Sequence, residues 1–177
     1  CLASAVCPSR HARAPSRPGP ATRLVAVSKP VAEDGVREAL AAGQRLFGEN
    51  RVQEAQSKFA ALKTDFPDLE LHLIGPLQTN KVKEAVALFD VIQSLDQVKL
   101  ADALAAERDK SGKAPRLYLQ VNTGDEPQKT GVFTRETEQF IAPAPKLVFP
   151  IGLLISIPPS ICYAHLTFLV YPQSQPV

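Results

Sequence analysis

The chain has 177 residues, of which 45% are hydrophobic and 21% are charged, and its formal net charge is +2. These values are typical of a globular domain with a sizeable core, and so small a charge gives no electrostatic attraction to nucleic acid or to a membrane surface. Three cysteines, an odd number without metal-ligand spacing, favour a reduced, cytoplasmic setting over a disulfide framework or a metal site.

Residues 1–22 are rich in proline and arginine and contain no acidic residue. They show neither helical nor strand periodicity, which predicts a disordered arm. An organelle transit peptide is the alternative, because such peptides are rich in arginine and poor in acids, although the prolines oppose the amphipathic helix it needs. The chain begins with cysteine and contains no methionine, so we expect a fragment or unreliable ends.

From Arg23 onward, short apolar runs alternate with segments of helical periodicity. The predicted strands are Leu24–Ser28, Arg45–Gly48, Leu69–Ile74, Asp90–Ser94 and Arg116–Asn122. The predicted helices are Val31–Ala42 followed by Gly43, a helix from Asn50 that Pro67 ends, one from about Thr79, one that Asp96 caps and that ends near Gly112, and Thr134–Ala142. This alternation predicts an α/β fold with a parallel sheet.

Successive right-handed βαβ units leave two architectures open, a doubly wound open sheet and a closed barrel. A dinucleotide-binding fold normally carries a glycine-rich fingerprint after its first strand. Here Ser28, Lys29 and Pro30 occupy that turn, which argues against the dinucleotide fold.

Lys29, at the end of the first predicted strand, is in an unusual place for a lysine. Strands of parallel sheets are buried on both faces, and lysine is almost never fully buried unless it forms an ion pair or has a chemical role. Desolvation lowers the pKa of an ammonium and increases the share of free amine, the form that attacks an aldehyde to make a Schiff base. The alternative is a strand-end lysine that reaches into solvent, and the strand alone leaves both interpretations open.

After Ala142 the pattern changes, and residues 147–170 are almost uncharged. A membrane span has to be considered for so long an apolar run. Pro150, Pro158 and Pro159 divide it, and the longest clean stretch is Ile151–Ile157. A buried sixth strand therefore explains this segment better than a membrane span.

Four local motifs occur in a fixed order. They are Ala26-Val-Ser-Lys29, Phe47-Gly-Glu-Asn50 with Gln53-Glu54, the decapeptide from His72 to Lys81, and Gln120-Val-Asn122 followed by Lys129-Thr-Gly131. Together they closely resemble the pyridoxal phosphate homeostasis proteins (the YggS/PROSC family) from Arg23 to about Ala142. The decapeptide is the most specific of the four, and Gly152-Leu-Leu is similar to a degraded sixth strand of that family.

The resemblance implies an alanine-racemase-type, TIM-like (β/α) barrel that is incomplete, with about five or six of the eight strands. It also implies that pyridoxal 5′-phosphate is held as a Schiff base on Lys29, at the carboxyl-terminal face where barrel chemistry lies. The chain would then comprise the arm at 1–22, the amino-terminal part of a cofactor-binding barrel at 23–142, and an aberrant proline-rich tail at 143–177 that includes the candidate sixth strand.

Asn50 and His72 are further candidate cofactor-binding residues. Asn50 would line the cofactor ring or cap the next helix, with Gln53 completing a capping-box-like pair. His72 lies within the third strand, where alternation would point it into the barrel, either toward the cofactor or as a hydrogen-bonded core histidine. The other polar residues of this region are Gln78 and Asn80, to which only the motif gives a role, Thr79, a predicted helix cap, and Lys81 and Lys83, predicted to face solvent.

In the resembling family the phosphate site comes from the last two strands, with a Gly-Met-Ser-type loop and a late segment with an arginine and glycines. Neither occurs in this sequence. We therefore expect the cofactor to bind more weakly and in a less well-fixed orientation, because barrels of this kind usually bind phosphate after strands seven and eight. We also expect unpaired sheet edges that favour association.

The leading functional hypothesis is a protein that binds pyridoxal phosphate without turnover, acts in intracellular homeostasis of this cofactor, and has PLP-dependent enzymes as candidate partners. One alternative is a truncated fragment that binds nothing. The other is a PLP-dependent amino-acid racemase, which needs acid/base groups on both faces of the substrate carbanion. In the resembling racemases one of these groups is a tyrosine from a second chain's additional domain, for which this chain has no room.

Overall fold

The computed structural model describes residues 23–124, 127, 130–141 and 151–156. The predicted arm at 1–22 and the predicted tail, apart from residues 151–156, lie outside these residues. In the described part of the chain, no helix has both the length and the apolar character needed to cross a membrane.

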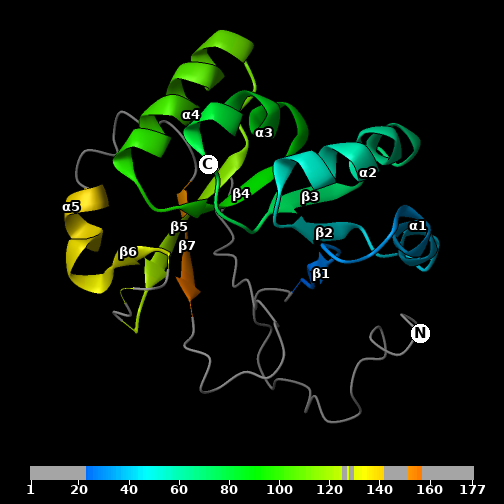
Figure 1. Cartoon of the computed structure of the whole chain (residues 1–177), viewed down its shortest axis with the longest axis horizontal. Helices are drawn as coiled ribbons and strands as arrows, with labels where there is room; N and C mark the ends of the chain where they lie inside the picture. The colour runs from blue at the N-terminus through cyan, green and yellow to red at the C-terminus, as the bar shows by residue number, and fades with distance from the viewer. Residues whose placement is uncertain (1–22, 125–126, 128–129, 142–150, 157–177) are drawn as a thin grey trace, which may run out of the picture.

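A parallel sheet forms the centre of the molecule (Figure 1). Its strands are β1 (Ala26–Val27), β2 (Leu46–Glu49), β3 (Glu70–Leu73), β4 (Val91–Leu95), β5 (Arg116–Asn122) and β7 (Ile151–Ser156). Strands β1 to β5 pair in chain order, and β7 pairs along the whole of β5. Neighbouring strands that follow each other in sequence and run parallel are the arrangement that βαβ units produce.

A short strand, β6 (Val132–Phe133), also pairs with β5, opposite Val121 and Asn122. Since β7 pairs with the same two residues and a strand has only two edges, β6 must lie on the edge that β4 occupies nearer the start of β5. The sequence did not predict β6. Two residues carry no periodicity, and their pairing depends on partner residues eleven positions earlier in the chain.

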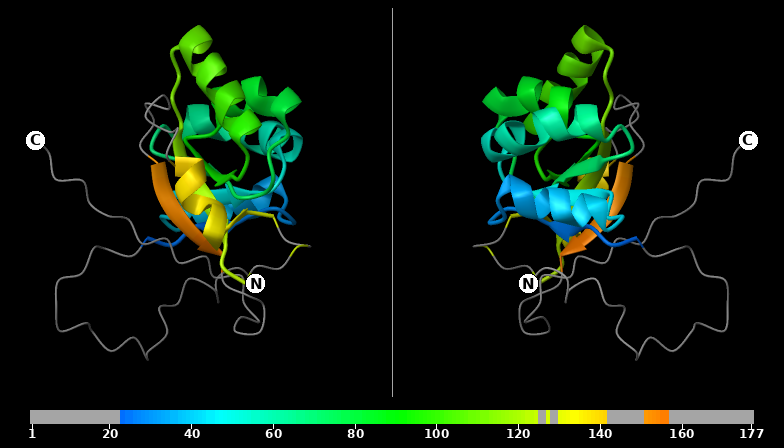
Figure 2. Two further views of the ribbon diagram at one scale, coloured as in Figure 1. Left: turned by 90° about the vertical axis from the view of Figure 1, so that its left-hand side faces the viewer. Right: turned by 90° about the vertical axis from the view of Figure 1, so that its right-hand side faces the viewer.

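Helices connect the strands and cover one face of the sheet (Figures 1 and 2). They are α1 (Glu33–Ala41), α2 (Val52–Asp65), α3 (Val82–Leu88) and α4 (Val98–Ser111), with a 3-10 turn, η2 (Thr79–Lys81), leading into α3. A second 3-10 turn, η3 (Thr134–Glu136), leads into α5 (Thr137–Ile141), which lies beside β6. The right-handed βαβ rule explains why the four crossover helices share one face.

The main core lies between the sheet and helices α1–α4. Alternate residues of the strands point into it, and Phe47 of β2 meets Phe59 of α2 with ring centroids 5.7 Å apart. Complete burial of a leucine or phenylalanine side chain contributes about 1.5–3 kcal/mol. The largest fully buried apolar side chains are Phe47, Phe59, Leu40, Leu62, Leu71, Leu73, Ile92, Leu95, Leu104, Leu117 and Leu119.

Glycines end two of the helices as predicted. Gly43 follows α1 at a φ of 95°, and Gly112 follows α4 at a φ of 71°. The Gly112 N–H donates to the carbonyl oxygen of Arg108 at 2.8 Å. Only glycine adopts this left-handed conformation without a steric cost, so each helix stops where the sequence suggested.

The predicted helix starts are wrong in detail. The residue before α2 is Arg51 rather than Asn50, and the residue before α4 is Gln97 rather than Asp96. The residues that precede α2, α4 and η2 make no capping hydrogen bond with their side chains, and the residue before η2 is Gln78, so Thr79 is not at the cap position.

The carboxylate of Asp96 interacts with the segment between β5 and β6 and not with the helix end. It accepts the backbone N–H of Gly131 and its own N–H.

The outer strands do not meet each other. In the described part of the chain, β1 pairs only with β2, and β7 only with β5, so the sheet is open. The predicted strand at 151–157 is present as β7 over residues 151–156, and Ile157 lies outside the described residues. The open parallel sheet agrees with the incomplete barrel that the resemblance implied.

Candidate functional site

The carboxyl ends of the parallel strands bring Lys29 and Asn50 to one edge of the sheet. Val27 pairs with Gly48, and Gly48 pairs with His72. Lys29 comes two residues after Val27, and Asn50 two residues after Gly48, so the two residues follow their strands at the same level. In parallel α/β proteins this edge is where ligands bind.

Lys29 lies in a turn directly after β1 and is exposed. Among the described residues, its ammonium has no hydrogen-bond acceptor and no ion-pair partner. The turn itself is ordered by two backbone hydrogen bonds, from Ser28 N–H to the Gly48 carbonyl at 3.0 Å and from Val31 N–H to the Ser28 carbonyl at 2.9 Å. The structure thus presents an unpaired primary amine on a fixed loop, which fits the chemistry of an aldehyde-bearing cofactor.

Two residues that were not predicted as site residues also bind the loop that carries Lys29. These are Glu49, the last residue of β2, and Lys58 in the middle of α2. Glu49 lies within the Phe47–Asn50 motif but was given no role of its own, and the spacing of Lys58 does not distinguish it from an ordinary helix lysine. Only the fold brings them into contact with each other and with the loop at residues 28–31.

Asn50 is half-buried and lies against the loop that follows β3. A Cβ atom at Gly75 would be 2.8 Å from the Asn50 Cα atom. Since real Cβ contacts are not so short, only glycine fits at position 75. The glycine of the specific decapeptide is therefore explained by this close approach of two backbone segments.

His72 is fully buried in β3, and protein groups engage both of its ring nitrogens. Its Nε2 atom is 2.9 Å from Glu70 Oε1, and its Nδ1 atom is 2.7 Å from Gln93 Nε2. Because the Gln93 amide can only donate from Nε2, Nδ1 accepts and the ring proton is on Nε2, from which it is donated to Glu70. This geometry is that of a hydrogen-bonded core histidine. A contact with a cofactor stays a prediction.

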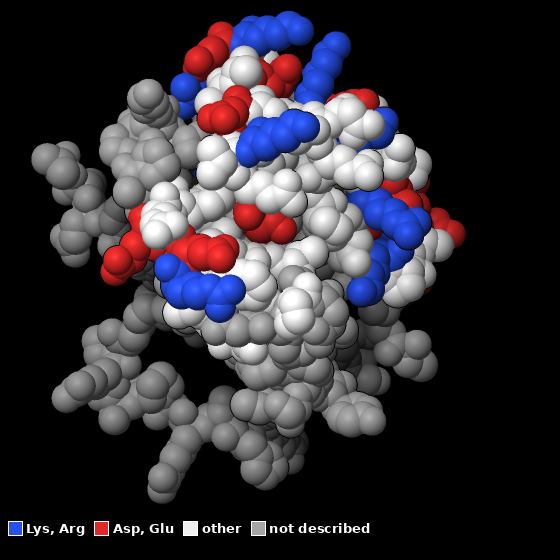
Figure 3. All heavy atoms as spheres, turned by 60° about the vertical axis from the view of Figure 1, so that its left-hand side comes forward, with Lys and Arg blue, Asp and Glu red and all other residues white. Residues whose placement is uncertain are grey.

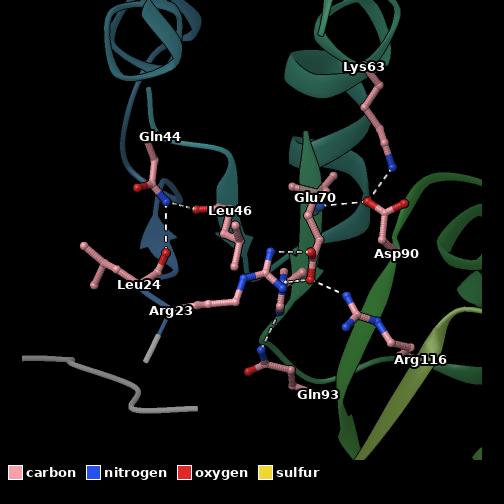
Figure 4. A network of polar contacts seen from close by, with 11 residues as sticks. Arg23, Leu24, Gln44, Leu46, Lys63, Glu70, Asp90, Gln93 and Arg116 are labelled. Carbon is pink, nitrogen blue, oxygen red and sulfur yellow. Dashed lines mark hydrogen bonds and ion pairs between the residues drawn. The ribbon is translucent and has the colours of Figure 1, made fainter. Parts of the chain in front are cut away.

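The His72 contacts belong to a charged network at the amino ends of the strands (Figure 4). Arg23 donates to Glu70 Oε2 at 2.8 Å, and Arg116 is paired with Glu70 Oε1. Burial disfavours ionisation of Glu70, but hydrogen bonds from His72 and Arg23 and the charge of Arg116 outweigh it and lower the pKa of Glu70 to about 2. The network is on the side of the sheet away from Lys29 and stabilises the fold.

The segment after β5 returns to the carboxyl edge of the sheet. Gln120 Nε2 donates to the Thr130 Oγ1 atom at 3.1 Å, and the Gly131 N–H donates to Asp96. Burial raises the pKa of Asp96, while the interaction with the Gly131 N–H lowers that pKa by a smaller amount. The last of the four motifs is thereby fixed next to the ends of β4 and β5, except for Lys129, which lies outside the described residues.

The polar residues of the decapeptide after β3 lie at the start of η2 and α3. Gln78, Thr79 and Asn80 are exposed at the carboxyl edge of the sheet. Lys81 Nζ lies 3.5 Å from Glu84 Oε1, and Lys83 is exposed. The predicted solvent-facing role of the two lysines therefore agrees with the structure, and roles for Gln78 and Asn80 stay predictions.

Other surface features do not compete with this site. Figure 3 shows acidic and basic side chains interspersed on the face it presents, as the small net charge suggests. A cleft of about 570 Å³ includes Lys63, Asp90, Lys113 and Arg116 in its lining. It lies where β4 and β5 begin, so it is at the amino edge of the sheet, opposite Lys29.

Comparison with known proteins supports the fold and the motif set. Residues 10–154 match the family model described as alanine racemase, N-terminal domain. The chain is 41% identical over 120 residues to a pyridoxal phosphate homeostasis protein of Pasteurella multocida, covering 68% of this chain and 52% of that protein. The chain thus spans about half the length of the curated relatives it matches.

Two solved structures complete the comparison. PipY of Synechococcus elongatus, with PLP bound, is 39% identical with a TM-score of 0.67, covering 81% of this chain and 66% of that one. An alanine racemase of Clostridium difficile is 15% identical with a TM-score of 0.58, covering 75% and 35% of the two chains. The second likeness concerns the fold alone and agrees with the predicted alanine-racemase-type architecture.

Proposed function

The chain belongs to the family of the alanine racemase N-terminal domain, and from that premise we propose that it binds pyridoxal 5′-phosphate as a Schiff base on Lys29 and acts in homeostasis of this cofactor. The resemblance of the four motifs to pyridoxal phosphate homeostasis proteins agrees with the relatives found. PipY, whose structure contains PLP, aligns with four-fifths of the chain.

The observation that carries the proposal is the position of Lys29. It is an exposed lysine, unpaired among the described residues, on a hydrogen-bonded turn at the carboxyl edge of a parallel sheet. Lys58 and Lys63, by contrast, each donate to a carboxylate and to at least one backbone carbonyl. An ammonium held in that way is not free to approach an aldehyde, whereas the Lys29 side chain has no such partner among the described residues.

The proposed reaction is a condensation. Lys29 would hold the cofactor by condensation of its free amine with the aldehyde carbon, which would form a C=N bond and release the aldehyde oxygen as water with the two amine protons. The cofactor supplies the aldehyde and a ring that can accept electrons. Asn50, half-buried at the same level as Lys29, would lie beside that ring.

We propose that the protein holds and releases the cofactor without turnover. The names of the relatives describe homeostasis and not an enzyme reaction. We further propose a cytoplasmic setting, on the odd cysteine count, and PLP-dependent enzymes as the recipients of the cofactor.

A titration with pyridoxal phosphate tests the proposal. The wild-type chain should give the absorption band of a Schiff base, which borohydride reduction makes permanent. Lys29→Ala should remove the band, because no other described lysine combines exposure with this loop. The matched control is Lys83→Ala, which removes another exposed lysine, on α3, and should keep the band. A band of equal intensity in Lys29→Ala would show that the proposal is wrong.

A further inference from the structure

Lys58 uses all of its hydrogen-bonding capacity on the loop that carries Lys29 and on one carboxylate. Its ammonium lies 2.6 Å from Glu49 Oε1, 2.8 Å from the Ser28 carbonyl oxygen and 3.1 Å from the Val31 carbonyl oxygen. An ammonium has three N–H donors, so these three acceptors match it one to one. Lys58 is thus a fully satisfied cation and a fixed point of the structure.

The two carbonyl groups that Lys58 binds are on either side of Lys29. Ser28 precedes it and Val31 follows Pro30, so one ammonium joins the two ends of the four-residue turn. The Ser28 and Val31 backbone N–H groups are engaged as well, with Gly48 and Ser28 respectively. The position of the Lys29 backbone therefore depends on a cation that comes from a different element, α2.

Glu49 completes the arrangement from the end of β2. Its side chain is fully buried, and Oε1 accepts both Lys58 and the Ser28 hydroxyl, the latter at 2.8 Å. Its second oxygen, Oε2, is buried and has no hydrogen-bond partner among the described residues. A buried carboxylate with one unpaired oxygen is costly, because desolvation is not fully compensated.

Stability alone is a poor explanation for such a pair. Buried ion pairs are often no more stabilising than apolar residues of the same size. What the pair does provide is a fixed distance between α2, the end of β2 and the loop at 28–31. An incompletely satisfied polar group at such a place is typical of positions where geometry matters more than stability.

We propose that Lys58 and Glu49 are positioning residues for Lys29, holding its loop so that the amine is presented at one place on the carboxyl edge of the sheet. Ser28 is the third positioning residue, because its hydroxyl donates to Glu49 and its carbonyl oxygen accepts from Lys58. This inference rests on the proposed role of Lys29 in binding an aldehyde cofactor. It adds that the rate of reaction at Lys29 is set by a salt bridge that does not touch the cofactor.

The chain offers a matched control in Lys63. This lysine is also in α2 and is also bonded to a carboxylate, Asp90 Oδ2 at 2.6 Å, and to a carbonyl oxygen, that of Leu88 at 2.8 Å. Its partners precede β4, at the opposite edge of the sheet from Lys29. Lys58→Met and Lys63→Met therefore remove similar interactions from one helix, but only the first removes contacts to the Lys29 loop.

The first measurement is the rate at which pyridoxal phosphate and borohydride label Lys29 in the full chain, read by mass spectrometry of peptides. We expect Lys58→Met to slow labelling by about tenfold or more relative to Lys63→Met, because misplacement of a reacting group by about 1 Å reduces rates by this order or more. Lys58→Arg, which keeps the charge, should recover most of the rate. Equal labelling rates in the two methionine variants, at equal melting temperatures, would overturn the proposal.

The second measurement does not depend on the cofactor. The Val31 N–H closes the turn on the Ser28 carbonyl, so its hydrogen exchange reports the order of the loop. We expect exchange about tenfold faster in Lys58→Met and unchanged in Lys63→Met. If the wild type is not labelled at Lys29, the proposed function fails, while this exchange still decides whether Lys58 positions the loop. Unchanged exchange in Lys58→Met would refute that role.

Ser28→Ala provides a milder variant in case Lys58→Met does not fold. It removes only the hydroxyl that donates to Glu49 and leaves both backbone carbonyl contacts of Lys58 in place. Labelling of Lys29 should slow by about threefold, less than in Lys58→Met, because only one of the hydrogen bonds around the loop is lost. A rate equal to that of the wild type would contradict the proposed part of Glu49 in positioning the loop.

Discussion

Gly75 packs so closely on Asn50 that a Cβ atom at position 75 would lie 2.8 Å from the Asn50 Cα atom. The contact joins the loop after β3 to the residue after β2, which are neighbours at the carboxyl edge of the sheet. It therefore fixes Asn50 next to the loop of Lys29.

Gly75→Ala should destabilise the chain by about 2–3 kcal/mol, because the new methyl group collides with backbone that cannot move aside as a side chain would. Urea unfolding followed by circular dichroism measures the loss. Gly112→Ala is the control: its surroundings are open, but its φ of 71° makes alanine strained, so it reports the backbone cost alone, about 1 kcal/mol. Equal losses in the two variants would contradict the steric account of Gly75.

Glu70 makes stability dependent on pH in the acid range. Its pKa is lowered from 4.5 to about 2 in the folded chain. A lowered carboxylate pKa stabilises the fold above the unfolded value of 4.5, and this contribution is lost as the pH falls from 4.5 toward 2. It amounts to about 3 kcal/mol at most. Unfolding free energies at a series of acid pH values should show a shallower decline in Glu70→Gln than in the wild type, and parallel curves would refute the assignment.

His72→Leu separates a core role from a cofactor role for the histidine. Glu70 and Gln93 would each lose a buried partner, so the variant should lose about 1–3 kcal/mol of stability. Labelling of Lys29 by pyridoxal phosphate and borohydride should stay near the wild-type rate at a temperature where the variant is folded. A large loss of labelling without a loss of stability would instead assign His72 to the cofactor.

Asp96 should make the stability of the fold depend on pH in the opposite direction to Glu70. Burial raises its pKa in the folded chain above the usual value of 3.8. A raised carboxylate pKa means that the folded state is favoured by protonation, so this contribution to stability increases as the pH falls through the raised pKa. Asp96→Asn keeps an oxygen for the Gly131 N–H and should remove this dependence while changing the stability near pH 7 by about 1 kcal/mol or less. Thermal unfolding from pH 4 to 7 compares the two chains, and an unchanged pH profile would contradict the account.

The alternation of strands and helices could be predicted because the core-facing residues follow regular periods. Arg116–Asn122 is a strand with the predicted bounds, since an apolar run there follows a helix that Gly112 ends. Lys29 stood out for a related reason, as a charged residue placed directly after an apolar strand. Local pattern is sufficient for features of this kind.

The helix starts and the support of the Lys29 loop could not be predicted. Asp96 and Asn50 are good capping residues by type, but tertiary contacts with Gly131 and Gly75 decide their surroundings. Lys58 and Glu49 are nine positions apart, and their meeting depends on how α2 crosses β2. Such contacts are set by packing between elements, which a single sequence does not display.

The most direct measurement maps where pyridoxal phosphate attaches to the chain. The protein is incubated with the cofactor, reduced with borohydride and digested, and the modified lysine is identified by mass spectrometry. We predict that Lys29 carries the pyridoxyl group well before any other lysine does, and that Lys29→Ala carries none at a comparable rate. Modification spread evenly over the exposed lysines, or unchanged in Lys29→Ala, would contradict the assignment of Lys29 as the cofactor-binding residue.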